Sequence, residues 1–142
     1  METEQLHRGR LIDHLHLVVR DLPASRRFYG AVFEVLGVPI GGEAHTYFWA
    51  DELFVSSADS EAALGELTGR CHLAFQARDR AMVEAFHTAG LAAGGTDNGA
   101  PGQRPYHPGY YAAFLLDPDG NNIEAVFHGE ADRSADSVVV TF

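Results

Sequence analysis

The sequence repeats itself, and this repeat limits the possible folds more than any other feature. A shift of 58 residues aligns residues 14–37 with residues 72–95 without a gap and gives seven identities in 24 positions. Random pairing of average compositions gives about one or two. The chain is therefore predicted to contain two copies of one structural unit. The identical pairs are His14 and His72, Leu15 and Leu73, Arg20 and Arg78, Asp21 and Asp79, Phe28 and Phe86, Ala31 and Ala89, and Gly37 and Gly95.

Each copy has the pattern of a strand, a helix and further strands. In the first copy we expect strands at 11–19, 38–40, 46–50 and 53–57, and a helix that begins after Asp21 or Ser25. In the second copy a strand at 71–77 and a helix after Asp79 precede a long Gly/Pro-rich loop at 96–109, with strands at 110–116 and 122–127. Each copy is predicted to be a βαβββ module, which makes the fold α+β. We expect one domain over residues 1–142, with modules at about 11–57 and 70–128, a connector at 58–69 and a tail at 129–142.

Composition narrows the classes of function. The net charge is −10, and all ten cationic side chains are arginines, which disfavours nucleic acid and anionic membranes as partners. No apolar run reaches about 18 residues, so no membrane span is expected. The polar start METEQLHRGR is unlike a signal peptide, and the single Cys71 suits a reducing cytoplasm. We therefore expect a cytoplasmic protein whose apolar end, VVVTF, adds an edge strand or covers a dimer contact.

Side-chain alternation predicts that three polar residues lie on the side of the sheets that faces away from the helices. These residues are His14 in the first strand, His72 in its repeat and Glu124 in the last strand. If the two sheets curl toward each other, the three side chains converge. Two imidazoles and one carboxylate bind Fe(II), Mn(II) or Zn(II) and leave coordination positions open. The alternative is a solvated glutamate and two unrelated strand histidines.

Aromatic and hydrogen-bonding residues surround this predicted centre and suit recognition of a small molecule. His107 is the first candidate for a catalytic acid or base because imidazole titrates near neutral pH, and His16 is the second. The alternative for each loop residue is a structural role. The candidate substrate-binding residues are Tyr47, Trp49, Phe54, Arg104, Tyr106, Tyr110 and Phe114.

Three stretches in this order resemble the vicinal oxygen chelate superfamily: 12-IDHLHLVVRDLPASRRFY-29, 72-HLAFQARDRAMVEAFHTAG-90 and 115-LLDPDGNNIEAV-126. The superfamily includes glyoxalase I, fosfomycin-resistance enzymes, extradiol dioxygenases and bleomycin-resistance proteins. The resemblance implies two tandem βαβββ modules that form a cupped mixed sheet around a metal site, with helices on the outer face, commonly in a homodimer. By position it places the ligands of one divalent ion (Fe, Mn, Zn or Ni) on His14, His72 and Glu124.

One departure from glyoxalase I affects the expected function. That enzyme has a fourth ligand, a glutamate on the last strand of the first module, whereas here Glu52 lies at a turn and Phe54 and Ser56 lie in the strand. The three-ligand set resembles that of the dioxygenases. The resemblance therefore implies a metal-dependent enzyme that acts on a small oxygen-containing organic substrate, as a lyase or isomerase or as a ring-cleaving dioxygenase. The alternatives are a non-catalytic drug-binding protein of the bleomycin-resistance type and a structural or regulatory dimer.

Overall fold

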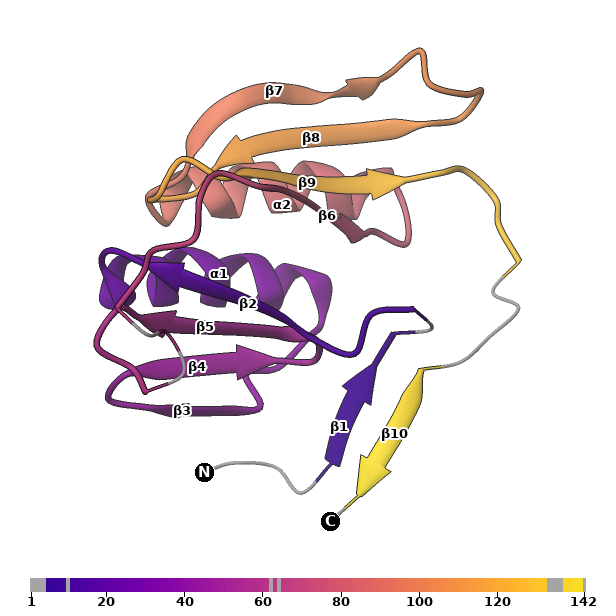
Figure 1. The fold of residues 1–142 in the computed structure, drawn as a ribbon. Helices are drawn as coiled ribbons and strands as arrows, with labels where there is room; N and C mark the ends of the chain where they lie inside the picture. The colour runs from indigo at the N-terminus through magenta and orange to yellow at the C-terminus, as the bar shows by residue number, and fades with distance from the viewer. Residues whose placement is uncertain (1–4, 10, 62, 64, 133–136, 142) are drawn as a thin grey trace. The chain divides into compact units, whose positions relative to one another are not determined.

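The computed structural model describes residues 5–9, 11–61, 63, 65–132 and 137–141. Its elements follow the order βαβββ twice, with one additional strand near each end of the chain (Figure 1). This order confirms the α+β fold and its two βαβββ modules. The first module contains β2 (Leu15–Val19), α1 (Leu22–Leu36), β3 (Gly42–Ala44), β4 (Tyr47–Ala50) and β5 (Leu53–Ser57). The second contains β6 (His72–Gln76), α2 (Arg80–Ala92), β7 (Thr96–Gln103), β8 (Tyr111–Leu116) and β9 (Asn122–Phe127).

The chain divides into two compact units that cross the module boundary. One unit holds β2 to β5 with the terminal strands, and the other holds α1 together with α2 and β6 to β9. Helix α1 contacts the second module through aromatic side chains: the ring of Phe33 lies 5.6 Å from that of Phe75. No helix in the described part of the chain is long and apolar enough to cross a membrane.

The sheet of the first unit has the strand order β2-β5-β4-β3, in which only β2 and β5 are parallel. Its register pairs Phe54 with both His16 and Trp49, so these side chains share one face of the sheet. The opposite face is buried, as the alternation of its apolar residues requires. The residues of that buried face are Leu17, Val19, Phe48, Ala50, Leu53 and Val55.

The sheet of the second unit has the order β6-β9-β8-β7, and α2 packs against β8, β7 and β9 (Figure 1). Asp79 begins α2 because its side chain accepts a hydrogen bond from the Met82 amide at 2.8 Å. Gly90 allows the helix to approach the sheet: a Cβ at this position would lie 2.2 Å from Leu115 Cδ1. The helix-facing residues are fully buried, namely Val83, Phe86, Ala113, Leu115, Ile123 and Ala125.

Four elements differ from the sequence-based expectation. The strand expected at residues 38–40 is instead β3, at Gly42–Ala44. The first strand begins at Leu15 rather than at Leu11, so His14 precedes the ladder. The expected Gly/Pro-rich loop is largely strand β7, an edge strand whose pairing with β8 shifts register twice. The tail forms β10 (Val138–Thr141), which pairs antiparallel with an unforeseen strand β1 (Gln5–Arg8). The tail thus forms a strand in a separate two-stranded sheet rather than at the edge of either four-stranded sheet.

The turn 117-DPDGN-121 is fixed by a buried carboxylate. Asp117 accepts hydrogen bonds from the amides of Asp119 and Asn121 at 2.9 and 2.8 Å, from Asn121 Nδ2 at 2.8 Å and from the Tyr29 hydroxyl at 2.5 Å. Asn121 Oδ1 in turn accepts from the Cys71 amide at 3.0 Å. This network connects α1, the start of β6 and the start of β9, and therefore sets the alignment of the two parallel strands.

We expect stability to fall at alkaline pH partly because of Tyr29. Burial, the charge of Asp117 and the hydrogen bond to it raise the pKa of Tyr29 well above the ordinary value of 10.0. The unfolded chain ionises this tyrosine above pH 10 while the folded chain keeps the proton, so its contribution, complete below pH 10, declines by about 1.4 kcal/mol per pH unit above it. Urea unfolding at pH 8, 10 and 11 should show a smaller alkaline loss for Tyr29→Phe than for wild type. Equal losses would contradict the assignment.

Candidate functional site

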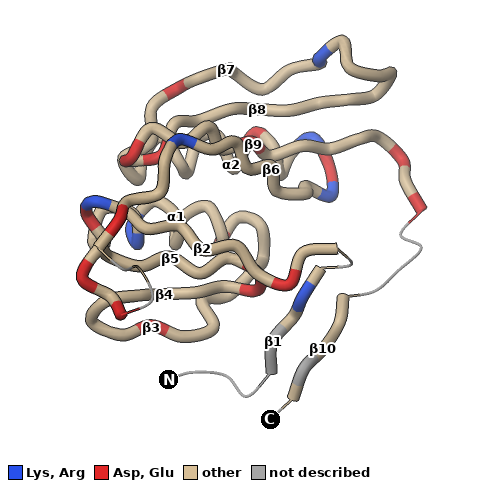
Figure 2. The backbone as a smooth tube through the Cα atoms, viewed as in Figure 1, with Lys and Arg blue, Asp and Glu red and all other residues tan. Residues whose placement is uncertain are grey.

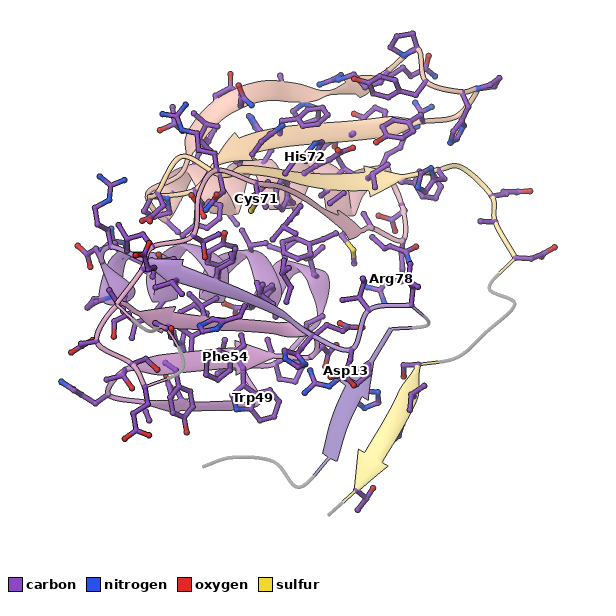
Figure 3. All side chains as sticks on the ribbon, viewed as in Figure 1. Asp13, Trp49, Phe54, Cys71, His72 and Arg78 are labelled. Carbon is purple, nitrogen blue, oxygen red and sulfur yellow. The ribbon has the colours of Figure 1, made fainter. Side chains whose placement is uncertain are left out.

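The centre of the second unit is a histidine–carboxylate pair on adjacent parallel strands. His72 Nε2 lies 2.8 Å from Glu124 Oε1. Glu124 is 2% exposed, and no arginine in the described part of the chain forms an ion pair with it. The imidazole is half-exposed and stands on β6, on the face of the sheet away from α2 (Figure 3). A buried carboxylate that only a histidine and a hydroxyl satisfy is unusual, because burial of a charge is costly without a compensating cation.

Strand register brings the two side chains together. In the parallel pair, His72 is opposite Asn122 and Ala74 is opposite Glu124, so the His72 and Glu124 side chains occupy the same face of neighbouring strands. On the other side of β9, Phe114 is directly opposite Glu124. The Phe114 ring lies 6.0 Å from the His72 ring and forms an apolar wall beside the pair.

Tyr110 is the second hydrogen-bond partner of the Glu124 carboxylate. Its hydroxyl donates a short hydrogen bond to Glu124 Oε2, the oxygen that His72 does not contact. Burial and this hydrogen bond to a negative group raise the pKa of Tyr110 to about 12. The tyrosine therefore remains a proton donor at neutral pH and orients Glu124 so that Oε1 faces the imidazole.

Two histidines and two tyrosines form an aromatic cluster next to this carboxylate. The Tyr110 ring lies 4.9 Å from Tyr106, 5.3 Å from His107 and 5.2 Å from His128. His107 Nδ1 is 2.8 Å from the Pro108 carbonyl oxygen, which only accepts, so this nitrogen carries a hydrogen. In a neutral ring His107 Nε2 is then an acceptor, and the donor at 2.9 Å is His128 Nδ1. These bonds leave His128 Nε2 as the basic nitrogen of the pair.

The first unit carries a smaller group of candidates. His16 Nε2 lies 2.7 Å from the buried Ser56 hydroxyl, and its ring contacts Phe54 edge-on at 5.0 Å. Tyr47 stacks on Phe54 at 5.2 Å, while Trp49 lies opposite Phe54 on the neighbouring strand (Figure 3). Burial lowers the pKa of His16, with a smaller effect from His14, so the ring is neutral at pH 7. Register thus places His16, Tyr47, Trp49 and Phe54 on one face.

His14 belongs to the first unit and lies outside the ladder. Its Nδ1 is 2.7 Å from Asp13 Oδ1, and its side chain is 60% exposed. In the described part of the chain, no three His, Cys, Asp or Glu side chains are grouped so that they could hold a metal ion. The structure therefore brings two of the three expected ligands, His72 and Glu124, into contact. His14 contacts its sequence neighbour Asp13.

Register also shows what occupies the position equivalent to Glu124 in the first module. The sequence repeat aligns His16 with Ala74, and Ala74 is opposite Glu124 whereas His16 is opposite Phe54. Phe54 is therefore the counterpart of the carboxylate. The first module therefore supplies an aromatic ring at the position that a carboxylate occupies in the second module.

The sequence did not single out His128 as a site residue. A signal for it existed, since His128 is four residues after Glu124 and the alternation of β9 continues to it. Its contact with His107 depends on the β7–β8 hairpin, which brings His107 next to the end of β9. No local sequence pattern predicts this contact.

Comparisons with known proteins agree with the fold. The family model of the Glyoxalase/Bleomycin resistance protein/Dioxygenase superfamily matches residues 11–125. A glyoxalase/bleomycin resistance protein from Albidiferax ferrireducens T118 is 30% identical, with coverage of 82% of this chain and 97% of that one and a TM-score of 0.67. A glyoxalase-related enzyme from Fulvimarina pelagi is 23% identical, with coverage of 93% and 98% and a TM-score of 0.69. A lactoylglutathione lyase from Agrobacterium tumefaciens is 22% identical, with coverage of 83% and 93% and a TM-score of 0.60.

No curated protein matches the chain. The family model covers most of the sequence and includes His14, His72 and Glu124. The chain therefore belongs to the Glyoxalase/Bleomycin resistance protein/Dioxygenase superfamily.

Proposed function

We propose that the protein is a metal-dependent enzyme that acts on a small organic substrate with two neighbouring oxygen atoms. The observation that carries this proposal is the contact of 2.8 Å between His72 Nε2 and the buried carboxylate oxygen of Glu124. Ligand atoms bound at about 2.0–2.1 Å and at right angles to one another lie about 2.9 Å apart. The two donor atoms thus have a spacing compatible with adjacent ligands of one ion, and no arginine in the described residues is paired with the carboxylate.

We assign the third ligand position to His14, so that two imidazoles and one carboxylate hold the ion. A bound divalent ion supplies Lewis-acid polarisation of a substrate oxygen or, as Fe(II), reactivity toward O₂. Tyr110 holds Glu124 in place, and Phe114 excludes water from one side of His72. His128 Nε2 is assigned to accept or return a substrate proton, and His107 fixes the tautomer of His128. Lyase, isomerase and dioxygenase chemistry share these roles.

Metal analysis of protein purified without added metal tests the proposal. Wild type should contain a stoichiometric divalent ion, and His72→Ala and Glu124→Ala should lose it. His128→Ala is the matched control, because it removes an imidazole from the same face of the sheet without removing an assigned ligand. It should retain the metal and lose turnover. If wild type binds no divalent ion, or no more than His72→Ala and Glu124→Ala bind, the proposal of a metal-dependent enzyme fails, and the drug-binding and the structural or regulatory alternatives remain.

The family commonly forms homodimers, and we propose one for this chain. Mixing of His14→Ala with Glu124→Ala distinguishes a shared site from a site within one chain. A dimer with shared sites regains metal after subunit exchange, since one site of each mixed dimer then contains His14, His72 and Glu124. A site within one chain regains none. Light scattering of the same samples gives the oligomeric state.

A further inference from the structure

Arg104 carries a positive charge in a strongly acidic chain. Between Asp97 and Asp117 it is the only charged residue, as the isolated blue segment of the β7–β8 hairpin shows (Figure 2). Its Nη2 donates to the Ala100 carbonyl at 2.6 Å and its Nη1 donates to the Gln103 carbonyl at 3.3 Å. No carboxylate in the described residues forms an ion pair with it. With five N–H groups, the guanidinium retains unused donors.

The backbone of the hairpin places this guanidinium on the face that carries the functional residues. The Arg104 amide donates to the Tyr110 carbonyl at 2.9 Å, so the two residues lie opposite one another at the end of the ladder. Alternation along β8 then puts Arg104 on the same face as Tyr110 and Phe114. The guanidinium carbon lies 5.3 Å from the centroid of the Phe114 ring, within the range of a cation–π contact.

Two glycines make room for the guanidinium against β7. A Cβ at Gly102 would lie 3.1 Å from Arg104 Nη1, and a Cβ at Gly99 would lie 3.3 Å from Nη2 and 3.0 Å from Phe114 Cδ2. Gly99 also has a φ of +152°, which L-residues rarely adopt. The Gly-rich composition of β7 therefore has a local purpose: side-chain-free positions let the guanidinium lie beside Phe114.

Phe114 neighbours both this cation and the histidine–carboxylate pair. Its ring is 5.3 Å from the Arg104 guanidinium carbon and 6.0 Å from the His72 ring, and its backbone is directly opposite Glu124. These two distances place the Arg104 guanidinium carbon within at most about 11 Å of the His72 ring centroid. A molecule whose oxygens bind at His72 and Glu124 can reach Arg104 if it carries an acidic group at that distance.

We propose that Arg104 binds a carboxylate of the substrate, and that the substrate is a carboxylic acid small enough for its acidic group to reach Arg104 while its neighbouring oxygens lie at His72 and Glu124. The inference deepens the proposed function, on which its metal-binding end rests. A forked guanidinium matches the two oxygens of a carboxylate, and such charge-assisted hydrogen bonds are strong.

Binding of two probes that differ only in this group tests the proposal. Calorimetry would compare catechol with 3,4-dihydroxybenzoate on wild type, Arg104→Gln, Arg104→Lys and the control Arg80→Gln, each with and without Mn(II). The Arg80→Gln substitution removes the same charge from the same unit. The Arg80 guanidinium carbon lies 4.6 Å from the centroid of the Tyr111 ring, on the opposite face of the sheet. Wild type and Arg80→Gln should bind the carboxylated probe about 10–100-fold more tightly than catechol.

Arg104→Gln should remove this preference and leave the affinity for catechol unchanged, and Arg104→Lys should retain part of it because charge remains without the fork. An equal preference in wild type and Arg104→Gln, or none in wild type, overturns the proposal. The Mn(II) arms report on the proposed function separately: if neither probe binds more tightly with the ion, the metal assignment fails while the ratio between the probes still tests Arg104.

Discussion

Asp117→Ala should lower the free energy of unfolding by about 3–5 kcal/mol, because it leaves several buried donors without an acceptor. The Asp117 carboxylate is 4% exposed and accepts hydrogen bonds from Tyr29, Asp119 and Asn121. Each unsatisfied buried donor costs about 1–3 kcal/mol. The substitution should also displace Asn121, whose Oδ1 accepts a hydrogen bond from the Cys71 amide at 3.0 Å. Because Cys71 precedes His72, this displacement should disturb the alignment of His72 with Glu124. Urea unfolding at pH 7 measures the loss.

Asp79→Ala provides the scale for this prediction. Asp79 accepts one hydrogen bond, from the Met82 amide at the exposed start of α2, so its loss should cost only about 1 kcal/mol. Asp117→Ala should therefore destabilise the protein several times more than Asp79→Ala. A smaller or equal loss would show that the turn tolerates water in place of the carboxylate, and that other contacts align β6 with β9.

The sequence repeat predicted the architecture because each copy combines a strand, an amphipathic helix and a terminating glycine at the same spacing. The positions of α2 after Asp79 and of β5 and β9 follow the expectation closely. These elements have strong local signals, namely a capping carboxylate and short alternating apolar runs between turn residues.

The elements that sequence analysis missed have weak local signals. Strand β7 contains Gly99, Pro101 and Gly102, residues that normally argue against a strand. It forms nonetheless because an edge strand with register shifts tolerates them, and because the glycines accommodate Arg104. Strands β1 and β10 pair although they lie near opposite ends of the sequence. The polar segment 5-QLHR-8 has no pattern that identifies Val138–Thr141 as its partner.

For the candidate site, side-chain alternation along the strands indicated which face of the sheet each residue occupies, but not which residues contact one another. The two-residue period of β9 and its neighbours is sufficient to place His72, Phe114 and Glu124 on one side of the sheet, as the register has them. The hydrogen bonds from Tyr110 to Glu124 and from His128 to His107 depend on how the loop 104–110 closes the hairpin. Loop closure is decided by tertiary packing, so these contacts needed the structure.

Tyr110→Phe should weaken the binding of Mn(II) or Zn(II) by about 10–100-fold, if Glu124 is a ligand as proposed. The substitution keeps the ring in the aromatic cluster and removes the hydrogen bond to Glu124 Oε2. That oxygen would then be buried without a donor, and the carboxylate would be free to rotate away from His72. Isothermal titration of metal-free protein at pH 7 measures the affinity.

Tyr106→Phe is the matched control, because it removes a hydroxyl from the same cluster, where Tyr106 is 68% exposed and touches Tyr110 only through its ring. Its metal affinity should equal that of wild type. Equal weakening in both variants would mean that the cluster acts through packing rather than through the hydroxyl of Tyr110. A full affinity in Tyr110→Phe would mean that burial between β6 and β8 orients Glu124 without help. The expected difference in metal affinity between the two variants therefore measures the effect of one hydrogen bond, which holds the buried Glu124 carboxylate toward His72.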